Sequence, residues 1–402
     1  MQETATAIHP APPQAIQRER LLRTIAVATA LIFFQAYMVA PLLPRLAAVF
    51  AVSIPTVSLA VPTYLFAYGI ATLFYGVLSD RFGRRPIMLA SMAAFCVLTG
   101  LTALAGNATE LIWLRLLTGL GASGVVPLAL ASIGDLFPFA QRGRPLGWLF
   151  GAMAGGMAFG AVAGVLLEPL LGWRGLFLAV AALGVLAFLV LLRQSPLLAR
   201  EASATPPSIR AVLGVYRHLL SSARGRRTYA YVYLNAILHS GVFTWLAVHL
   251  SRRYGLGETG IGLALLGYGI PGFLFGPTIG RLADRWGRNR LIPLGLLLSA
   301  LCTLALAADP PLALMPVLVT LLSLGYDLTQ PLLGGIVTDL SPQRGQAMGL
   351  NVLILFVGFG SGSLILGTML PLGLDFAFRV FGAAALAAAA AALYLFRTET
   401  HR

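Results

Sequence analysis

Gly76-Val-Leu-Ser-Asp80-Arg81-Phe-Gly83-Arg84-Arg85 separates two long apolar runs, and a close copy occurs downstream as Gly280-Arg-Leu-Ala-Asp284-Arg285-Trp-Gly287-Arg288-Asn-Arg290. Subtracting positions gives 284 − 80 = 204, and the same offset carries Gly121 onto Gly325, Pro127 onto Pro331 and Asp135 onto Asp339. This period is far longer than that of any solenoid repeat, so it indicates a duplicated domain. The sequence therefore predicts two halves with the same orientation.

The composition identifies the class of protein. Of the 402 residues, 58% are hydrophobic and only 10% are charged, whereas a soluble domain carries about 25% charged residues. Apolar stretches long enough to span a membrane as helices, roughly 20 residues each, number six before residue 194 and six after residue 227. We therefore expect an all-α integral membrane protein, with twelve transmembrane helices in two six-helix halves related by a parallel repeat.

This organisation divides the chain into five parts. They are a cytoplasmic N-terminal tail (1–23), an N-terminal half (24–193), a cytoplasmic linker (194–227), a C-terminal half (228–396) and a cytoplasmic tail (397–402). The first helix is expected from about Thr24 to Pro44, the fourth from near Glu110 to just before Asp135, and the tenth from about Pro316 to Leu340.

The linker contains a helical pattern of its own. Apolar residues recur at helical spacing opposite Arg210 and Arg217, namely Ile209, Val212, Leu213, Tyr216, Leu219 and Leu220. A short helix with one apolar and one basic face is typical of a segment that lies on a membrane surface. We expect this helix to lie on the inner membrane face and to position the two halves.

The formal net charge of +14 is best explained by membrane topology. All 28 basic residues are Arg, and most fall in loops on one side of the predicted membrane. This positive-inside bias predicts a multi-pass protein of the inner (cytoplasmic) cell membrane with both termini in the cytoplasm. No basic face with interleaved aromatic residues stands outside the membrane, so nucleic-acid binding is not expected.

The two cysteines give no sign of a disulfide or a metal site. Cys96 and Cys302 both lie within apolar runs, where a free thiol behaves as a small hydrophobic group. We therefore expect no metal and no cofactor.

Together, these features resemble the major facilitator superfamily over essentially the whole chain. The loop pattern Gly-x-x-x-Asp-Arg-x-Gly-Arg follows the second and the eighth helices. Further matches are Arg115-x-x-x-Gly119-x-Gly121, Asp135-Leu-Phe-Pro138 with Arg142-Gly143, and Gly172-Trp173-Arg174. These resemble the drug and sugar efflux branch of twelve-helix proton antiporters. One position departs from that pattern, because Val165 stands where a proline is expected.

The resemblance implies that the two repeated loops latch the inner ends of the halves together and release during alternating access. Asp80 and Asp284 stand at helix C-terminal ends, where a carboxylate is unfavourable unless a cation or a neighbouring helix N-terminus lies beside it. The expected gating residues are Gly76, Asp80, Arg81, Gly83, Arg84, Arg85, Gly280, Asp284, Arg285, Gly287, Arg288, Asp135, Arg142, Asp339 and Arg344.

The predicted fifth helix presents a face of small residues. Its glycines are Gly151, Gly155, Gly156, Gly160 and Gly164, and such a face lets a neighbouring helix approach closely. Helix packing alone explains these glycines. A moving seam against the eighth or the eleventh helix is the alternative.

The internal repeat also separates scaffold from candidate site. Polar positions that differ between the halves mark where a transport path is asymmetric, and the offset of 204 pairs Asp327 with Ser123, Gln330 with Val126, His239 with Gln35, and Arg115 with Val319. In the superfamily the helices that carry these positions line the central cavity. The candidates for proton coupling or substrate contact are Asp327, His239, Arg115, Gln330, Gln35, Asn235, Tyr37 and Tyr326.

Asp327 is the one acidic residue expected in the middle of a membrane helix. A carboxylate near the bilayer centre costs at least about 2.5 kcal/mol and is tolerated mainly beside a cavity or a partner. His239 carries the side chain most readily titrated near neutral pH. We expect Arg115 either to balance Asp327 or to hold an anionic group; the resemblance ties it to proton coupling.

The sequence thus predicts a secondary transporter, not an enzyme, that works by alternating access and exports a small amphipathic or lipophilic solute in exchange for protons. Its expected partners are the solute, protons and the lipid bilayer, and we expect a monomer. A sugar or metabolite facilitator or symporter and a flippase for lipid-linked substrates fit the same scaffold. A transport-dead sensor or scaffold is the alternative from a different class.

Overall fold

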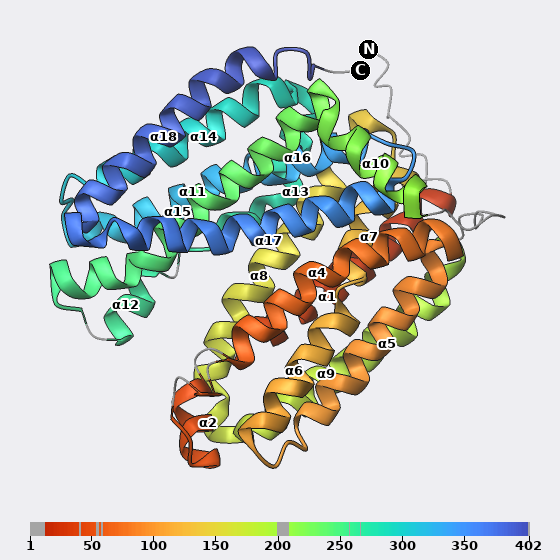
Figure 1. The fold of residues 1–402 in the computed structure, drawn as a ribbon, viewed down its shortest axis with the longest axis horizontal. Helices are drawn as coiled ribbons and strands as arrows, with labels where there is room; N and C mark the ends of the chain where they lie inside the picture. Colours follow the sequence, from red (N-terminus) through yellow and green to blue (C-terminus); the bar gives the residue numbers. More distant parts are fainter. Residues whose placement is uncertain are drawn as a thin grey trace, which may run out of the picture.

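The computed structural model describes residues 13–39, 42–53, 56–57, 59–198, 209–256, 258–265 and 267–400, and these residues are almost entirely helical (Figure 1). In the first half the long helices are α1 (Pro13–Tyr37), α4 (Ala60–Phe82), α5 (Arg84–Thr102), α6 (Ala108–Ala122), α7 (Val125–Leu136), α8 (Gly143–Leu166) and α9 (Glu168–Gln194). In the second half they are α11 (Ala223–Tyr254), α13 (Ile270–Trp286), α14 (Arg288–Leu306), α15 (Met315–Asp327), α16 (Gln330–Val337), α17 (Arg344–Thr368) and α18 (Leu374–Leu395). Shorter helices are α2 (Leu43–Phe50), α10 (Ile209–Ser221) and α12 (Glu258–Leu265).

Twelve helical spans in the described chain are long and apolar enough to cross a membrane. The first six end at Leu198 and the last six begin at Ala223, which confirms the predicted fold class. Each predicted half forms its own bundle, with the first half at the lower right of Figure 1 and the second at the upper left.

Two of the predicted membrane helices are interrupted. The fourth span divides into α6 and α7 at Ser123 and Gly124, and the tenth divides into α15 and α16 at Leu328 and Thr329. Pro331 lies in the first turn of α16, where a missing backbone N–H is tolerated. Asp327 therefore lies at the C-terminal end of α15, and the expectation that it lies mid-helix was wrong.

The first helix also differs from the prediction. It begins at Pro13 and ends at Tyr37, and a separate short helix, α2, starts at Leu43. The single span expected from Thr24 to Pro44 is therefore shifted toward the N-terminus, and helix extends into the segment predicted as the tail. Residues 1–12 of that tail lie outside the described residues.

The linker helix forms as α10. Leu219 is buried, and the Tyr216 hydroxyl donates a hydrogen bond to the Leu73 carbonyl of α4 at 3.3 Å. Leu213 and Leu220, expected on the same apolar face, are instead 61% and 45% exposed. Residues 199–208 of the linker lie outside the described residues.

The halves pack most extensively through two pairs of helices, α4 with α17 and α8 with α13. At each crossing glycine faces glycine, since a Cβ on Gly76 would collide with the Gly345 carbonyl and a Cβ on Gly147 with the Gly276 carbonyl. The backbones can approach this closely only because both residues lack side chains. The repeat therefore places equivalent glycine contacts in two positions.

The predicted glycine face of α8 is divided between two neighbours. Gly151 and Gly155 face α13, where a Cβ would meet the Gly272 carbonyl and the Phe273 ring. Gly156 and Gly160 face the Ala30 and Phe34 carbonyls of α1. Gly164 is buried farther along α8. One part of this face thus lies between the halves, and the other lies within the first half.

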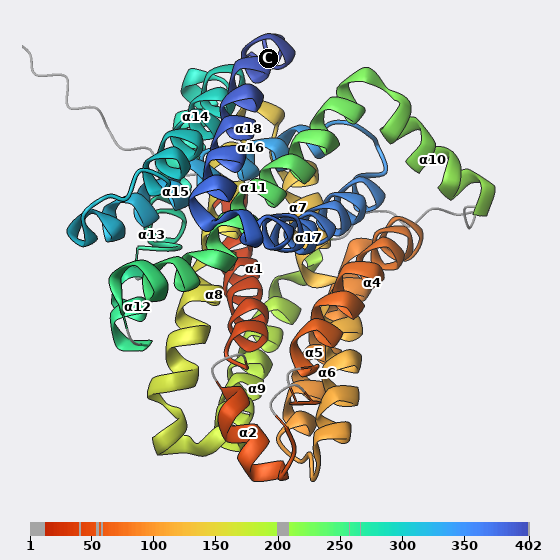
Figure 2. The same ribbon diagram turned by 60° about the vertical axis from the view of Figure 1, so that its left-hand side comes forward.

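The halves meet most closely at one end of the molecule, which we call the linker end. It contains α10, the C-terminal ends of α4, α13 and α18, and the N-terminal ends of α8 and α17 (Figures 1 and 2). Helices α2 and α12 lie toward the opposite end. The hydrogen bonds between the halves that involve Asp80, Asp135, Arg142, Asp284 and Arg288 all lie at the linker end.

We predict that Gly147→Ala lowers the thermal stability of the purified protein. The new methyl group would force α8 away from α13, and overpacking of this kind costs about 1–3 kcal/mol. The matched control is Gly360→Ala in α17, where a Cβ meets nothing within 4 Å. Ala is favoured over Gly in a helix by about 0.5–1 kcal/mol, so the control should unfold at the same or a higher temperature. Equal melting temperatures for the two variants would show that the glycine contact is not under steric constraint.

Candidate functional site

Asp80 joins the first half to the second through backbone hydrogen bonds. Its carboxylate accepts the Gly345 N–H at 3.3 Å and the Gln346 N–H at 3.1 Å, both at the N-terminus of α17. The first N–H groups of a helix have no partner within the helix and carry partial positive charge. The unfavourable position of Asp80 at the end of α4 is thereby offset by a favourable one at the start of α17.

Asp284 makes the equivalent contact from the second half to the first. Its carboxylate accepts the Gly143 N–H at 3.0 Å and the Arg144 N–H at 3.4 Å, at the N-terminus of α8. After each of these helices a glycine turns the chain, Gly83 with φ 89° and Gly287 with φ 87°. These positive φ values favour glycine.

Arginine side chains extend the Asp80 contact. Arg84, which is 1% exposed, binds Asp135 through a short hydrogen bond, and Asp135 also pairs with Arg344 of the second half at 2.5 Å. Arg84 lies 3.9 Å from the Asp80 carboxylate. Asp80, Arg84, Asp135 and Arg344 therefore form one charged cluster that crosses between the halves, and Arg84 is its buried member.

The arginines near Asp284 make different contacts from those near Asp80. Arg288 lies 3.7 Å from Asp284, but it donates to the Phe139 carbonyl at 3.0 Å and stacks over the Phe139 ring at 4.1 Å. Asp339 pairs instead with Arg142 at 3.7 Å and Arg224 at 2.8 Å. Phe139 lies within a loop two residues longer than its counterpart, because 143 − 135 = 8 whereas 345 − 339 = 6.

Arg142 connects the ends of α7 and α16. It donates to the Thr338 hydroxyl at 3.1 Å and to the Gly134 carbonyl at 2.9 Å. Burial and the nearby charge of Arg344 lower the pKa of Arg142 to about 10. The side chain therefore remains protonated at neutral pH.

Three of the expected gating residues, Arg81, Arg85 and Arg285, are exposed. Arg81 lies over the Phe82 ring at 4.6 Å. The pattern Asp-Arg-x-Gly-Arg thus contributes its Asp and its last Arg to the contact between the halves.

A polar cluster in the second half surrounds Asp327, which is 5% exposed. Its carboxylate accepts a hydrogen bond from the Gly272 backbone of α13 and lies 3.5 Å from the Ser323 hydroxyl. A Cβ on Gly272 would lie 2.7 Å from Asp327 Oδ1. Glycine at this position therefore lets α13 approach the carboxylate.

His239 lies in an aromatic cluster beside Asp327. Its ring stacks on Tyr326, with 4.0 Å between centroids and 27° between planes, and His239 Nε2 lies 3.3 Å from the Tyr268 hydroxyl. Phe243 packs against both the His239 and the Tyr268 rings. One turn away, the Asn235 amide donates to Gln330 Oε1 at 3.1 Å.

Arg115 is fully buried in the first half and does not contact Asp327. It donates to Gln35 Oε1 at 2.7 Å, to two backbone carbonyls of Ala36 and Ala60, and stacks over Tyr64 at 4.1 Å. Among the described residues no Arg forms an ion pair with Asp327. The expectation that Arg115 balances Asp327 was wrong at the level of direct contact.

Tyr37 of α1 lies near Tyr64 of its own half and near Tyr268 and Tyr326 of the other. Tyr68 of α4 also packs on Phe356 of α17, at 5.3 Å between centroids. Aromatic rings from both halves therefore lie between Arg115 and Asp327.

Several buried polar atoms in the central helices lack a hydrogen-bond partner in the described residues. They are Gln35 Nε2, the Tyr64 and Tyr68 hydroxyls, Gln330 Nε2, and both side-chain amide atoms of Asn351. An unpaired buried polar group costs about 1–3 kcal/mol. Their concentration among helices α1, α4, α16 and α17 indicates a place where polar groups of a ligand or water would be favourable.

Tyr64, Gly272 and Asn351 were not predicted from the sequence. Asn351 could have been found, because the repeat offset becomes 345 − 143 = 202 after the shorter loop and pairs Asn351 with Leu149. Tyr64 lies one helical turn before Tyr68, which is a weak signal. Gly272 contributes through its backbone, and nothing in its sequence position identifies that contact.

Comparisons with known proteins agree with this architecture. The sequence profile described as Major Facilitator Superfamily matches residues 25–260 and 234–402. An uncharacterized MFS-type transporter of Bacillus subtilis (strain 168), YwfA, is 29% identical over 335 residues, which cover 82% of this chain and 80% of the relative. A chloramphenicol resistance protein of Streptomyces lividans is 27% identical over 355 residues, covering 87% and 88%.

Solved structures share the fold. The crystal structure of the human organic anion transporter MFSD10 superposes with a TM-score of 0.76 at 18% identity, covering 96% of this chain and all of that one (100%). The proton:xylose symporter XylE superposes with a TM-score of 0.70 at 17% identity, covering 97% of both chains.

We predict that Asp284→Asn or Asp80→Asn separates the halves at the linker end. The neutral amide accepts backbone hydrogen bonds more weakly than a carboxylate and loses the interaction with the helix dipole. Spin labels on Arg85→Cys and Arg290→Cys, one exposed position in each half, should report a longer mean distance. The control is Asp309→Asn, since Asp309 pairs with Arg253 away from this end. An unchanged distance distribution in both variants would contradict the assigned role of the two carboxylates.

Proposed function

Because this chain belongs to the major facilitator superfamily, a family of membrane transporters, we propose that it is a secondary transporter that exports small amphipathic or lipophilic solutes in exchange for protons. The single observation that carries the proposal is the buried carboxylate of Asp327, beside an aromatic cluster and without an ion-pair partner in the described residues. A carboxylate in this position is costly in a membrane unless it has a function there.

The polar and aromatic side chains around Asp327, which we call the central cluster, favour an amphipathic solute. Four rings, those of Tyr37, Tyr268, Tyr326 and His239, offer apolar and weakly polar contacts. The unpaired amides of Gln35 and Gln330 offer hydrogen bonds. Chloramphenicol resistance proteins among the relatives support a solute of this kind.

Proton coupling would follow from competition at Asp327. In one state the carboxyl group holds a proton; in the other it holds the solute or the solute's positive charge. Protonation removes the charge that the solute binds, so the two ligands exclude each other. Breaking the Asp80 and Asp284 contacts at the linker end would then give the other side of the membrane access to the same site.

A second candidate is a facilitator or symporter for a sugar or an anionic metabolite. The observation that favours it is Arg115, a fully buried cation bound to the neutral Gln35 and two carbonyls. In that case the solute would contact Arg115 and the neutral amides, and Asp327 would take no direct part.

We predict that chloramphenicol and lipophilic cations raise the melting temperature of the purified protein, because a ligand of the native state stabilises it by mass action. For a cation the rise should be larger at pH 8 than at pH 6, since fewer protons compete for Asp327 at the higher pH. Xylose and an organic anion serve as the comparison. If these alone stabilise the protein, and to the same extent at both pH values, the facilitator is the better description.

We predict that Asp327→Asn abolishes efflux driven by an imposed proton gradient in proteoliposomes. Asn has nearly the same shape as Asp but carries neither a proton nor a charge, so exchange without a gradient should remain measurable for a neutral solute such as chloramphenicol, which does not need the carboxylate charge. Glu110→Gln, at an exposed helix end, is the control for loss of one carboxylate. Full gradient-driven efflux in the Asp327 variant would exclude this residue as the coupling group.

A further inference from the structure

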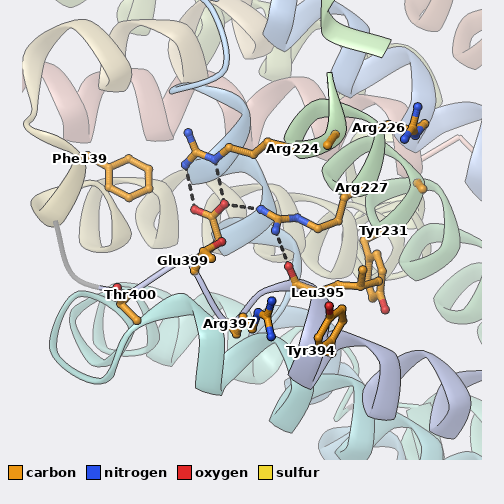
Figure 3. Close-up of a pocket in the computed structure, with 13 residues that line it drawn as sticks. Phe139, Arg224, Arg226, Arg227, Tyr231, Tyr394, Leu395, Arg397, Glu399 and Thr400 are labelled. Atoms are coloured by element: carbon orange, nitrogen blue, oxygen red, sulfur yellow. Dashed lines mark hydrogen bonds and ion pairs between the residues drawn. The ribbon is translucent and has the colours of Figure 1, made fainter. Parts of the chain in front are cut away.

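A cavity lies at the linker end of the second half, between the start of α11 and the end of α18 (Figure 3). Its volume is about 690 Å³. It is lined by Phe139, Ala223, Arg224, Arg226, Arg227, Ala230, Tyr231, Tyr394, Leu395, Arg397, Thr398, Glu399 and Thr400. None of these residues belongs to the central cluster around Asp327.

The lining carries an excess of positive charge. Four of its residues are Arg and one is Glu, which gives 4 − 1 = +3. Asp339 binds Arg224 from outside the lining at 2.8 Å, and counting it leaves an excess of two. The cavity therefore suits an anion.

The single carboxylate of the lining is already held by two of the arginines. Glu399 accepts two hydrogen bonds from Arg224, each 2.8 Å long, and a short one from Arg227 (Figure 3). Burial acts to raise the pKa of Glu399, but the hydrogen bonds and charges of Arg224 and Arg227 outweigh it and hold the pKa below its ordinary value. Glu399 therefore occupies this position as an anion.

The other two arginines of the lining are available to a ligand. Arg226 and Arg397 are exposed, and within the described residues neither forms an ion pair with a carboxylate. Arg397 lies over the Tyr394 ring at 4.2 Å. The hydroxyls of Thr398 and Thr400 add hydrogen-bond donors along the same wall.

An apolar surface continues from the cavity along α18. Leu393 and Tyr394 are each 65% exposed, and Leu386, two turns earlier, is 42% exposed. Because α18 is one of the twelve candidate membrane spans, these side chains face the hydrocarbon region, and the arginines stand at its boundary. Tyr side chains are common at this depth.

We propose that this cavity binds the phosphate headgroup of an anionic phospholipid, with the acyl chains against the exposed face of α18. Basic pockets between transmembrane helices are suited to such headgroups. Arg226 and Arg397 make the first contacts. Arg224 and Arg227 can join them only as far as the phosphate competes with Glu399. A soluble phosphate carries a similar charge but makes no contact with the exposed apolar face of α18. The phospholipid is therefore the better match.

The test is calorimetric titration of the purified protein in an uncharged detergent with dioctanoyl phosphatidylglycerol. Dioctanoyl phosphatidylcholine and glycerol phosphate are the comparison ligands, the first lacking net charge and the second lacking acyl chains. We expect phosphatidylglycerol to bind most tightly. Equal binding of glycerol phosphate would assign the site to a soluble phosphate, and equal binding of phosphatidylcholine would remove the role of charge; either result overturns the proposal.

The double substitution Arg226→Gln and Arg397→Gln should weaken phosphatidylglycerol binding about 25-fold, from about fivefold for each arginine near a membrane surface. Arg217→Gln, on the exposed face of α10 at the same end of the molecule, is the matched control and should bind as the unaltered protein does. Unchanged affinity in the double variant would refute the assignment. If that variant does not fold, the salt dependence of the unaltered protein decides, because high ionic strength should weaken phosphatidylglycerol binding and leave phosphatidylcholine unaffected.

Discussion

A carboxylate at the end of one helix, hydrogen-bonded to the first backbone N–H groups of a helix from the other half, is the interaction on which this architecture depends. It occurs twice, at Asp80 with α17 and at Asp284 with α8. Each contact requires the two helices to approach at glycine, because a Cβ on Gly76 or Gly280 would collide with the facing backbone. The carboxylate and the glycine are therefore both required for the same contact between helices. This explains why the two residues occur together in both copies of the loop.

The same helix pair connects the linker end with the central cluster. Asp284 lies near the end of α13, and Gly272 lies 284 − 272 = 12 residues earlier, about 18 Å along the helix. Gly272 packs against Gly151 of α8 and hydrogen-bonds the Asp327 carboxylate. A shift of α13 relative to α8 would therefore change both the Asp284 contact and the surroundings of Asp327. This chain of direct contacts is a physical basis for coupling between the two places.

The sequence was sufficient to predict the twelve helices, the two halves and the linker helix, because membrane spans and duplication leave strong periodic signals. It also predicted that Asp80 and Asp284 stand at helix ends and need either a cation or a neighbouring helix N-terminus beside them. It did not predict the breaks at Gly124 and Leu328, since apolar composition continues through them. It also failed to predict which buried residues meet: Arg115 binds Gln35 rather than Asp327, and Gly272 acts through a backbone atom that no sequence pattern reveals. Which side chains meet between the halves depends on how each helix is rotated about its own axis. The amino-acid composition of a helix does not reveal that rotation.

The donors of the two contacts between the halves are main-chain groups, and this has a genetic consequence. Every amino acid except proline supplies the same backbone N–H, so changes at positions 346 and 144 leave the donors in place. Each carboxylate, in contrast, is supplied by the side chain of one residue. A variant that has lost Asp80 or Asp284 accordingly cannot recover through a complementary change in its hydrogen-bond partner, as a pair of side chains can. Second-site revertants are therefore expected to restore the balance between conformations elsewhere in the protein.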